Sequence, residues 1–200
     1  MALNKETIVL TCIAILNRDG ADGLSMRTLG KELGVQAASL YWHFSSKDAL
    51  FGAIAEHLCQ QYALPPESGD LETDIMAYFC TYRAMLLPVR DSVTVFENSL
   101  PNTPKRAALI RAFSQKLTEF GVSPENLMTV SNMLNNYVLS FTADEIRFNN
   151  TSPEQKESFY QLVRSEGQPA QPYERDFDEQ FDLGLEIMLA GIKAVEDSSE

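Results

Sequence analysis

The sequence predicts an all-α protein in which a three-helix helix-turn-helix domain precedes a larger helical domain. Apolar residues recur three and four positions apart through almost all of the 200 residues, which is the spacing of one face of an α-helix. Alternating β-branched residues are scarce, and the sequence holds no internal repeat. Two prolines and a glycine interrupt the helical pattern at 64–70. We therefore expect a domain boundary there, between residues 1–63 and residues 64–200.

The N-terminal domain is expected to hold four helices. They cover residues 5–17, 25–33, 36–44 and a stretch from Ser45 or Ser46 to about Tyr62. Asp19-Gly20 should end the first helix and Gly34 the second, since glycine readily takes the left-handed conformation of a tight helix exit. Ser45 and Asp48 have the spacing of a capping box. The second and third helices, joined by one tight turn, form the helix-turn-helix at about residues 25–44.

The C-terminal domain is expected to hold six helices. They lie near residues 70–87, 89–99, 104–120, 124–148, 153–165 and 175–195, and residues 167–172 are expected to form a mobile loop. The Ser-Pro-Glu sequences at 123–125 and 152–154 place a capping hydroxyl before a first-turn proline and an acid near the positive end of a helix. Thr103-Pro104 is similar but precedes basic residues. These three places predict helix starts.

Composition limits the functions that need to be considered. A content of 44% hydrophobic and 22% charged residues is typical of a folded globular chain. The sequence shows neither a leader nor an apolar run long enough for a bilayer, so we expect a cytoplasmic protein without a membrane partner. Cys12, Cys59 and Cys80 are far apart, and His43 and His57 are the two histidines. Disulfides, metal sites and cofactors are therefore not expected.

The charge distribution favours a local contact with DNA. A net charge of −12 argues against general affinity for nucleic acid, because phosphate contacts need lysine and arginine. Between residues 25 and 47, however, Arg27, Lys31 and Lys47 stand against Glu32 alone. This basic stretch within an acidic chain favours a specific, salt-sensitive contact.

The third helix has the composition of a helix that enters the major groove. Leu40 and Phe44 are the two positions clearly needed for the core, and the other face can contact DNA, although Tyr41 and Trp42 can also be partly core and we expect one of them to serve both purposes. The residues that can contact DNA are Gln36, Ala37, Ala38, Ser39, Tyr41, Trp42 and His43. The small alanines allow close approach to the bases, and the hydroxyl groups suit phosphates, as do His43 and Lys47. Arg27 can reach a guanine edge with two nitrogen atoms.

Three short stretches resemble the signature of the tetracycline-repressor (TetR) family. They are Gly23-Leu24-Ser25-Met26-Arg27-Thr28-Leu29, Leu33-Gly34-Val35 and Leu40-Tyr41-Trp42-His43-Phe44, followed by Lys47 and Leu50. The Leu-Tyr-Trp-His run, the chain length and the C-terminal helix spacing are most similar to the tetracycline-repressor subgroup. The resemblance implies a homodimeric transcription regulator, in particular a ligand-released repressor of a palindromic operator. The residues that it places on the operator are Arg27, Thr28, Ala37, Ala38, Ser39, Tyr41, Trp42, His43 and Lys47.

The sequence also departs from that subgroup. Ala37 and Ala38 stand where tetracycline-binding members have glutamine and proline, which implies a different operator. The effector histidines of those members fall near Ala63, Phe96 and Asn136 here. Magnesium and tetracycline contacts are therefore not expected.

Two C-terminal helices are expected to form the dimer interface. No charged residue occurs from Asn126 to Ala143, and a helix uncharged for so many turns has more than one face out of water. We expect this helix and the last one to pair with their symmetry mates in a four-helix bundle, as in the family. The stripes assigned to the partner are Leu127, Val130, Leu134 and Val138, with Phe181, Leu185, Met188 and Ile192. Gly184 and Gly191 are expected to permit close approach.

A small-molecule effector is expected in an apolar pocket of the C-terminal domain. The candidate lining residues are His57, Phe79, Tyr82, Arg83, Leu86, Phe96, Leu100, Phe113, Tyr137 and Phe141. Each can equally be an ordinary core residue, and His57 is better explained as a half-buried polar side chain. A buried Arg83 needs an anionic partner, either from the protein or from a ligand.

An all-α enzyme and a protein-interaction adaptor are the competing classes. An enzyme should carry a cluster of acids, bases or nucleophiles, and no such motif can be assembled from this sequence. An adaptor would leave the composition of the third helix unexplained. A regulator without enzymatic activity is therefore favoured, while its operator, its effector and the choice between repression and activation stay open.

Overall fold

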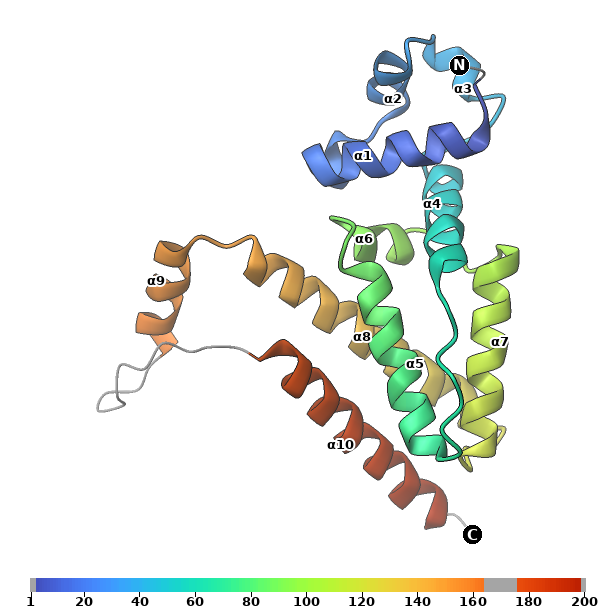
Figure 1. Cartoon of the computed structure of the whole chain (residues 1–200), viewed down its shortest axis with the longest axis vertical. Helices are drawn as coiled ribbons and strands as arrows, with labels where there is room; N and C mark the ends of the chain where they lie inside the picture. Colours follow the sequence, from blue (N-terminus) through green and yellow to red (C-terminus); the bar gives the residue numbers. More distant parts are fainter. Residues whose placement is uncertain (1–2, 164–175, 199–200) are drawn as a thin grey trace.

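The computed structural model describes residues 3–163 and 176–198, and all regular secondary structure in those ranges is helical, as the sequence predicts. The helices are α1 (Lys5–Gly23), α2 (Met26–Leu33), α3 (Ala37–Leu40), α4 (Lys47–Gln61), α5 (Leu71–Leu86), α6 (Ser92–Glu97), α7 (Pro104–Glu119), α8 (Leu127–Asn149), α9 (Pro153–Val163) and α10 (Phe177–Asp197). Helices α1 to α3 form one end of the molecule, and α4 leads from them into the rest (Figure 1). None of the helices in these ranges combines the length and hydrophobicity that a membrane crossing needs.

Hydrogen-bonded caps set the ends of the short N-terminal helices. The Ser25 hydroxyl accepts the Thr28 amide at 3.0 Å, and Gly34 ends α2 in the left-handed conformation with φ of 68°. Ser46, not Ser45, caps α4, because its hydroxyl accepts the amide of the third helical residue at 3.1 Å. Each cap gives a partner to an amide that the helix itself leaves unpaired.

Helix α3 is shorter than the sequence predicts. Regular α-helix covers Ala37–Leu40 rather than 36–44, and residues 41–43 continue as turns. The amides of His43 and Phe44 both donate to the Leu40 carbonyl at 2.9 Å, so the chain tightens before it enters α4. Aromatic residues are weaker helix formers than the alanines that precede them, which explains why the regular helix ends where the aromatic run begins.

Most other helix boundaries follow the sequence closely, but α6 covers only Ser92–Glu97 of the predicted 89–99, and α1 continues past its predicted end to Gly23. Gly20 interrupts α1 with φ of 75° and ψ of −178°, as expected from its place after Asp19. The starts predicted at Pro104 and Pro153 are confirmed. Helix α8 instead begins at Leu127, because residues 124–126 form a turn.

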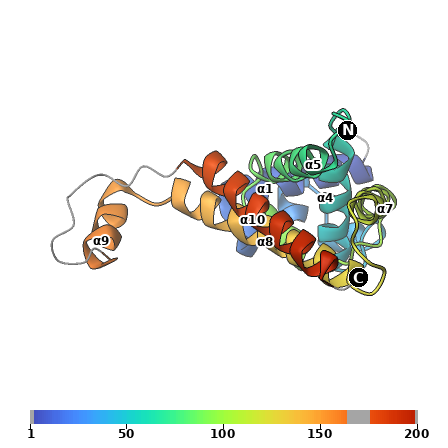
Figure 2. The same ribbon diagram turned by 90° about the horizontal axis from the view of Figure 1, so that it is seen from below.

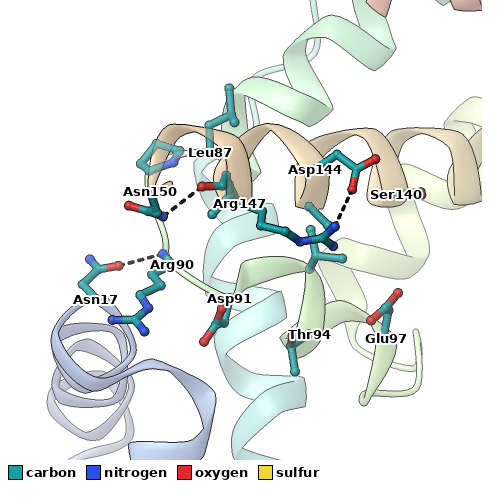
Figure 3. Close-up of a pocket in the computed structure, with 14 residues that line it drawn as sticks. Asn17, Leu87, Arg90, Asp91, Thr94, Glu97, Ser140, Asp144, Arg147 and Asn150 are labelled. Carbon is teal, nitrogen blue, oxygen red and sulfur yellow. Dashed lines mark hydrogen bonds and ion pairs between the residues drawn. The ribbon is translucent and has the colours of Figure 1, made fainter. Parts of the chain in front are cut away.

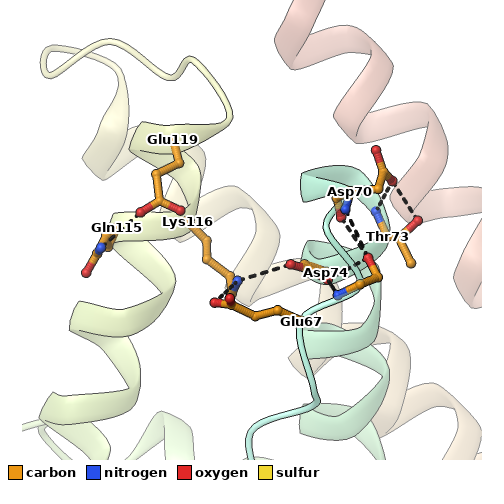
Figure 4. Close-up of polar contacts among 8 residues, drawn as sticks. Glu67, Asp70, Thr73, Asp74, Gln115, Lys116 and Glu119 are labelled. Carbon is orange, nitrogen blue, oxygen red and sulfur yellow. Dashed lines mark hydrogen bonds and ion pairs between the residues drawn. The ribbon is translucent and has the colours of Figure 1, made fainter.

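A polar cluster holds the loop between the two halves of the chain (Figure 4). The buried carboxylate of Asp74 accepts the Ser68 amide at 2.7 Å and the Ser68 hydroxyl at 2.8 Å. The Lys116 ammonium of α7 lies 3.4 Å from the other Asp74 oxygen and 3.5 Å from Glu67. The hydrogen bonds from Ser68 and the charge of Lys116 hold the pKa of Asp74 below its ordinary value. The loop after α4 is therefore fixed against α5 and α7.

Helices α8 and α10 lie side by side (Figures 1 and 2) and pack through the stripes that the sequence assigned to a partner chain. Val130, Leu134, Val138, Phe181, Leu185 and Ile192 are buried inside the protomer, while Leu127 and Met188 are half-buried against the same core. Packing within their own chain therefore accounts for the six buried side chains, and the assignment of these stripes to a dimer interface stays a prediction. Periodicity located the stripes but not what they pack against.

The two glycines of α10 have different surroundings. A β-carbon at Gly184 would collide with the hydroxyl group of Tyr137, which donates to the Phe181 carbonyl at 3.0 Å. The close approach at Gly184 is therefore an approach of α8 to α10 within one chain. At Gly191, which is exposed, no described atom outside the neighbouring residues and the backbone of its own helix lies within 4 Å of the corresponding position.

A second apolar face of α8 and α10 is open to solvent in the single chain. Its exposed large side chains are Met128, Met133, Leu183, Ile187 and Val195. Ile187, for example, is 64% exposed. We call these five residues the outer apolar face. A surface of this kind on two adjacent helices is typical of a protein–protein interface.

Helix α9 lies apart from α4 to α7 in both views (Figures 1 and 2). It adjoins the end of α8, where the Lys156 ammonium lies 4.1 Å from the centroid of the Phe148 ring. Phe159 and Leu162 on α9 are exposed. The predicted end of this helix at 165 and the predicted loop at 167–172 lie outside the described residues.

Candidate nucleic-acid interface and ligand cavity

Helix α3 and the turn after it expose aromatic side chains at the outer end of the molecule. Leu40 and Phe44 are buried, whereas Tyr41 is 55% and Trp42 91% exposed. His43 between them and the core is half-buried. Large aromatic residues are normally buried, so this exposure leaves Tyr41 and Trp42 available for a partner.

The remaining predicted DNA contacts lie on α2, α3 and the start of α4. Arg27, Gln36, Ala38, Ser39 and Lys47 are exposed, and Thr28 and Ala37 are half-buried. The Lys47 ammonium donates one hydrogen bond to the Ala21 carbonyl at 2.9 Å, which leaves two of its three N–H groups for a phosphate. The Thr28 and Ser25 hydroxyls lie 2.8 Å apart in a shared hydrogen bond. The structure thus brings all ten sequence-predicted residues to one end of the molecule.

One close packing contact fixes α2 against α3, and one ion pair fixes α2 against α1. A β-carbon at Gly30 would lie 2.9 Å from the Val35 carbonyl oxygen and 3.2 Å from the Ala37 nitrogen, so only glycine allows this close packing. From α1, Arg18 donates to both carboxylate oxygens of Glu32 at 3.1 and 3.2 Å. This two-pronged pair also neutralises the acidic residue of the basic stretch. The Glu32 charge is therefore taken up by Arg18 and not by the exposed Arg27 or Lys47.

The C-terminal half contains a cavity of about 180 Å³ bounded by α4 to α8. Its lining residues are Cys59, Tyr62, Tyr78, Phe79, Tyr82, Phe96, Pro101, Arg106, Leu109, Ile110, Ser131, Asn132 and Asn135. Aromatic rings with a few polar groups are the usual composition of a small-molecule site. We call this space the ligand cavity.

Three of the ten sequence-predicted effector residues line the ligand cavity, namely Phe79, Tyr82 and Phe96. The others do not line it, and the structure gives each a different place. Leu86 and Phe113 are core residues, His57 is half-buried on α4, Leu100 is exposed, and Tyr137 and Phe141 pack on Phe181 of α10. Packing within the chain accounts for those that are buried, and their assignment to an effector site stays a prediction.

Arg83 is also absent from the cavity lining, and the protein itself supplies its anionic partners. Its Nε donates to Glu145 at 2.7 Å and its Nη1 to Asp178 at 2.7 Å. The side chains of Arg83 and Glu145 are 8% and 9% exposed, whereas that of Asp178 is 85% exposed. Burial alone would lower the pKa of Arg83, but the two carboxylates raise it above its ordinary value. Arg83 therefore joins α5 to α8 and α10 and is not free to hold a ligand.

Two family models together span most of the sequence. Residues 11–54 match the model described as bacterial regulatory proteins, tetR family, and residues 64–196 match the tetracyclin repressor-like, C-terminal domain. The chain belongs to the TetR family. It is a DNA-binding transcription regulator of this family: the first matched range contains α2 and α3, and the second contains most of the residues that line the ligand cavity.

Individual relatives support this assignment over the whole chain. The tetracycline repressor protein class C of Escherichia coli is 28% identical over 199 residues, which cover 96% of this chain and 91% of that protein. The class A repressor from transposon 1721 of Escherichia coli is 30% identical over 135 residues, or 64% of this chain and 62% of that protein.

Solved structures of ActR from Streptomyces coelicolor have the same fold. Apo ActR is 25% identical, with a TM-score of 0.84 over 100% of both chains. ActR in complex with actinorhodin is 25% identical, with a TM-score of 0.84 over 98% of this chain and 99% of that one.

The three positions at which the resemblance places the effector histidines have different surroundings in this chain. Of the three positions, Phe96 lines the ligand cavity, whereas Ala63 and Asn136 are exposed. The described residues also contain no cluster of three or more histidine, cysteine, aspartate or glutamate side chains that could hold a metal ion.

Sequence reasoning missed most of the cavity lining. Tyr62 follows directly after α4, so the sequence marks it as the end of a helix, and nothing in the sequence sets Tyr78 apart from the other aromatic residues of α5. Asn132 and Asn135 are polar residues in an uncharged helix, which is a signal that could have found them. Arg106 follows directly after Lys105 in a helix first turn, a place where basic residues are usually solvated.

Helix α4 connects the ligand cavity with the DNA-binding end. Cys59 and Tyr62 on its last turn line the cavity, and the helix begins beside the recognition segment (Figure 1). One turn before Cys59, the Glu56 carboxylate accepts the amides of Lys105 at 2.9 Å and Arg106 at 3.2 Å. These bonds pair the first turn of α7 with α4. Burial alone would raise the pKa of Glu56, but the Thr103 side chain and these two amides together lower it.

A larger open groove of about 980 Å³ lies where α1 meets α6 and α8 (Figure 3). The Arg90 amide donates to Asn17 at 2.8 Å, and the Arg90 guanidinium donates to the Arg18 carbonyl at 3.2 Å. Asp91 accepts the Ala21 amide at 2.7 Å. These hydrogen bonds are a second connection between the DNA-binding end and the body of the protein.

Proposed function

We propose that the protein is a cytoplasmic, homodimeric repressor that binds a palindromic operator and releases it when a small molecule fills the ligand cavity. The exposure of Tyr41 and Trp42 beyond the buried Leu40 and Phe44 is the observation that carries the DNA-binding part. The cavity and the likeness to ActR, which was solved with actinorhodin, support the ligand-responsive part. The relatives are regulators, so we expect no enzymatic activity.

In this proposal the operator contacts fall into two groups. Arg27, Ala37 and Ala38 face the base edges, where a bidentate arginine–guanine contact contributes about 1 to 3 kcal/mol of discrimination. The hydroxyls of Ser39 and Tyr41, with Gln36, Thr28, Trp42, His43 and Lys47, hold the phosphate backbone and the register. Base contacts specify the sequence, and phosphate contacts set the salt dependence of binding.

Selection of bound sequences from random duplex DNA tests this function. We expect a palindrome whose half-sites lie about one helical turn apart, roughly 34 to 36 Å. Fluorescence anisotropy with the selected duplex should then show at least tenfold weaker binding for Arg27→Ala and Tyr41→Ala. Arg111→Ala, which removes an exposed arginine from α7, is the matched control and should bind normally. Enrichment of no sequence, or equal binding by all variants, would show that this end of the protein does not read DNA.

We propose that the outer apolar face forms the dimer interface. It lies on α8 and α10, the pair of helices expected to form the bundle, and its large apolar side chains are exposed in the single chain. Leu183→Glu and Ile187→Glu should shift sedimentation equilibrium at micromolar concentration to the monomer, because each places a charge in an apolar contact. Leu64→Glu, in the exposed interdomain loop, is the control. A wild-type monomer, or dimers of all three variants, would contradict this interface.

Release would pass through α4. A ligand that contacts Cys59 and Tyr62 touches the end of α4. The beginning of α4 lies beside α3 and the turn that follows α3. The ligand can shift the balance between two states only by its difference in affinity for them, typically about 1 to 3 kcal/mol. Changing the angle of α4 in both protomers would change the separation of the two recognition helices.

A further inference from the structure

Arg106 is the one charged side chain among the described residues that line the ligand cavity. Its Nη1 donates to the Ser99 carbonyl at 3.2 Å and the Ser99 hydroxyl at 2.8 Å, and its Nη2 donates to the Phe96 carbonyl at 3.1 Å. All three acceptors are neutral. A guanidinium carries five N–H donors, so these bonds leave two donors, including that on Nε.

No carboxylate within the described ranges lies within 4.0 Å of the Arg106 guanidinium, in contrast to Arg83 with its two acids. Glu56 is close in the fold, but it accepts the main-chain amide of Arg106. Burial lowers the pKa of Arg106, consistent with the lack of a negative neighbour. A half-buried cation without a counter-charge carries a desolvation cost that an incoming anion can offset.

The rest of the cavity can hold the apolar part of such an anion and an anion oxygen that does not bind Arg106. Burial raises the pKa of Cys59 to about 11, so this thiol brings no negative charge to the cavity. On the α8 side, the buried hydroxyl of Ser131 has no hydrogen-bond partner among the described residues, and Asn135 shares a long hydrogen bond of 3.4 Å with Tyr82. Aromatic rings from Tyr62, Tyr78, Phe79, Tyr82 and Phe96 form the walls.

We infer that the effector is a small aromatic carboxylate, whose carboxylate pairs with Arg106 and whose ring lies between the aromatic walls. The inference rests on the proposed ligand-responsive function and specifies the chemistry of its ligand. A cavity of about 180 Å³ is below the usual range of about 300 to 1,000 Å³ for drug-sized ligands. A body of one or two fused rings therefore fits better than a larger one.

Contact with Arg106 would also allow the ligand to affect the position of α4. A carboxylate that draws the guanidinium toward the cavity centre competes with the bonds to Ser99 and Phe96. Arg106 lies in the first turn of α7, and its own amide is held by Glu56 of α4. Movement of this turn is therefore passed directly to the helix that leads to the recognition segment.

Isothermal titration calorimetry of the full-length protein with matched pairs of probes tests the inference. The pairs are 2-naphthoate with 2-naphthamide and benzoate with benzamide, which differ in charge but hardly in shape. At least one acid should bind about tenfold or more tightly than its amide, since a charge-assisted bond is about twice as strong as a neutral one. Arg106→Met should abolish this preference. Arg111→Met, which removes an exposed arginine from the same helix, should preserve it.

Each outcome has a distinct meaning. Acids that bind no better than their amides, or that do not bind at all, overturn the inference. The comparison of acid and amide on the wild-type chain does not depend on whether Arg106→Met folds, which circular dichroism checks separately. A failure of the proposed function would instead appear in the selection experiment, in which no operator sequence would be enriched from random DNA. An amide that binds and weakens operator binding would overturn the anionic ligand while supporting the ligand-responsive regulator.

Discussion

Replacing Arg83 by methionine should destabilise the protein more than any change at its exposed partner. The substitution leaves the Glu145 carboxylate, 9% exposed and 2.7 Å from the lost Nε, buried without a cation. Breaking a buried pair in this way costs about 3 to 5 kcal/mol. Asp178 is 85% exposed, and an exposed pair contributes only about 0 to 1 kcal/mol. Asp178→Asn should therefore cost far less than Arg83→Met.

The double variant Arg83→Met/Glu145→Leu separates the net worth of the pair from the cost of an unpaired charge. Removing both charges should restore most of the loss, because apolar replacements of buried pairs are often neutral or stabilising. Urea denaturation followed by far-UV circular dichroism at a fixed protomer concentration gives the four free energies of unfolding. Equal losses for Arg83→Met and Asp178→Asn, or a double variant no more stable than Arg83→Met, would refute this reasoning.

Three further predictions concern the contacts that join the helices. Gly184→Ala should displace Tyr137 from α10 and break its hydrogen bond to Phe181, which lowers the free energy of unfolding by about 1 to 3 kcal/mol. Gly191→Ala, with open space around it, should change the free energy of unfolding little. Thermal denaturation compares the two variants. The pKa of Glu56 is lowered in the folded state from an ordinary value of 4.5. Its stabilising effect is therefore present above that value and is lost as the pH falls through the folded pKa, so the stability difference between wild type and Glu56→Gln should shrink below about pH 4.5. A difference that grows there would show the opposite sign of coupling. Asp91→Ala removes the acceptor of the Ala21 amide and should speed hydrogen exchange at Ala21 by at least tenfold, as measured by NMR. Glu97→Ala, at the end of α6, is the control. Unchanged exchange in Asp91→Ala would mean that Asp91 does not hold α1.

The sequence predicted the DNA-binding end well because local chemistry decides it. Gly34, the serine caps and the aromatic run each act within a few residues, so their consequences can be worked out from neighbours along the chain. The residues assigned to the operator consequently lie together. The length of α3 was the exception, since the end of the regular helix depends on how the chain must enter α4.

The C-terminal half was harder to predict, because its contacts connect distant parts of the chain. Helix α8 is apolar on two faces, and nothing in its periodicity says which one packs against α10. Arg83 and Arg106 look alike in the sequence, yet one meets Glu145 and Asp178 while the other meets only neutral acceptors. That difference follows from tertiary packing and became visible only in the structure.

Trp42 is the one tryptophan of the chain, and it stands almost fully in water at the tip that would meet DNA. Its intrinsic emission should therefore have the long wavelength of a hydrated indole in the native protein and change little when the core melts. The same residue should respond strongly when a duplex closes over it. The emission of Trp42 should therefore report whether DNA occupies this end of the protein, and it should report very little about whether the core is folded.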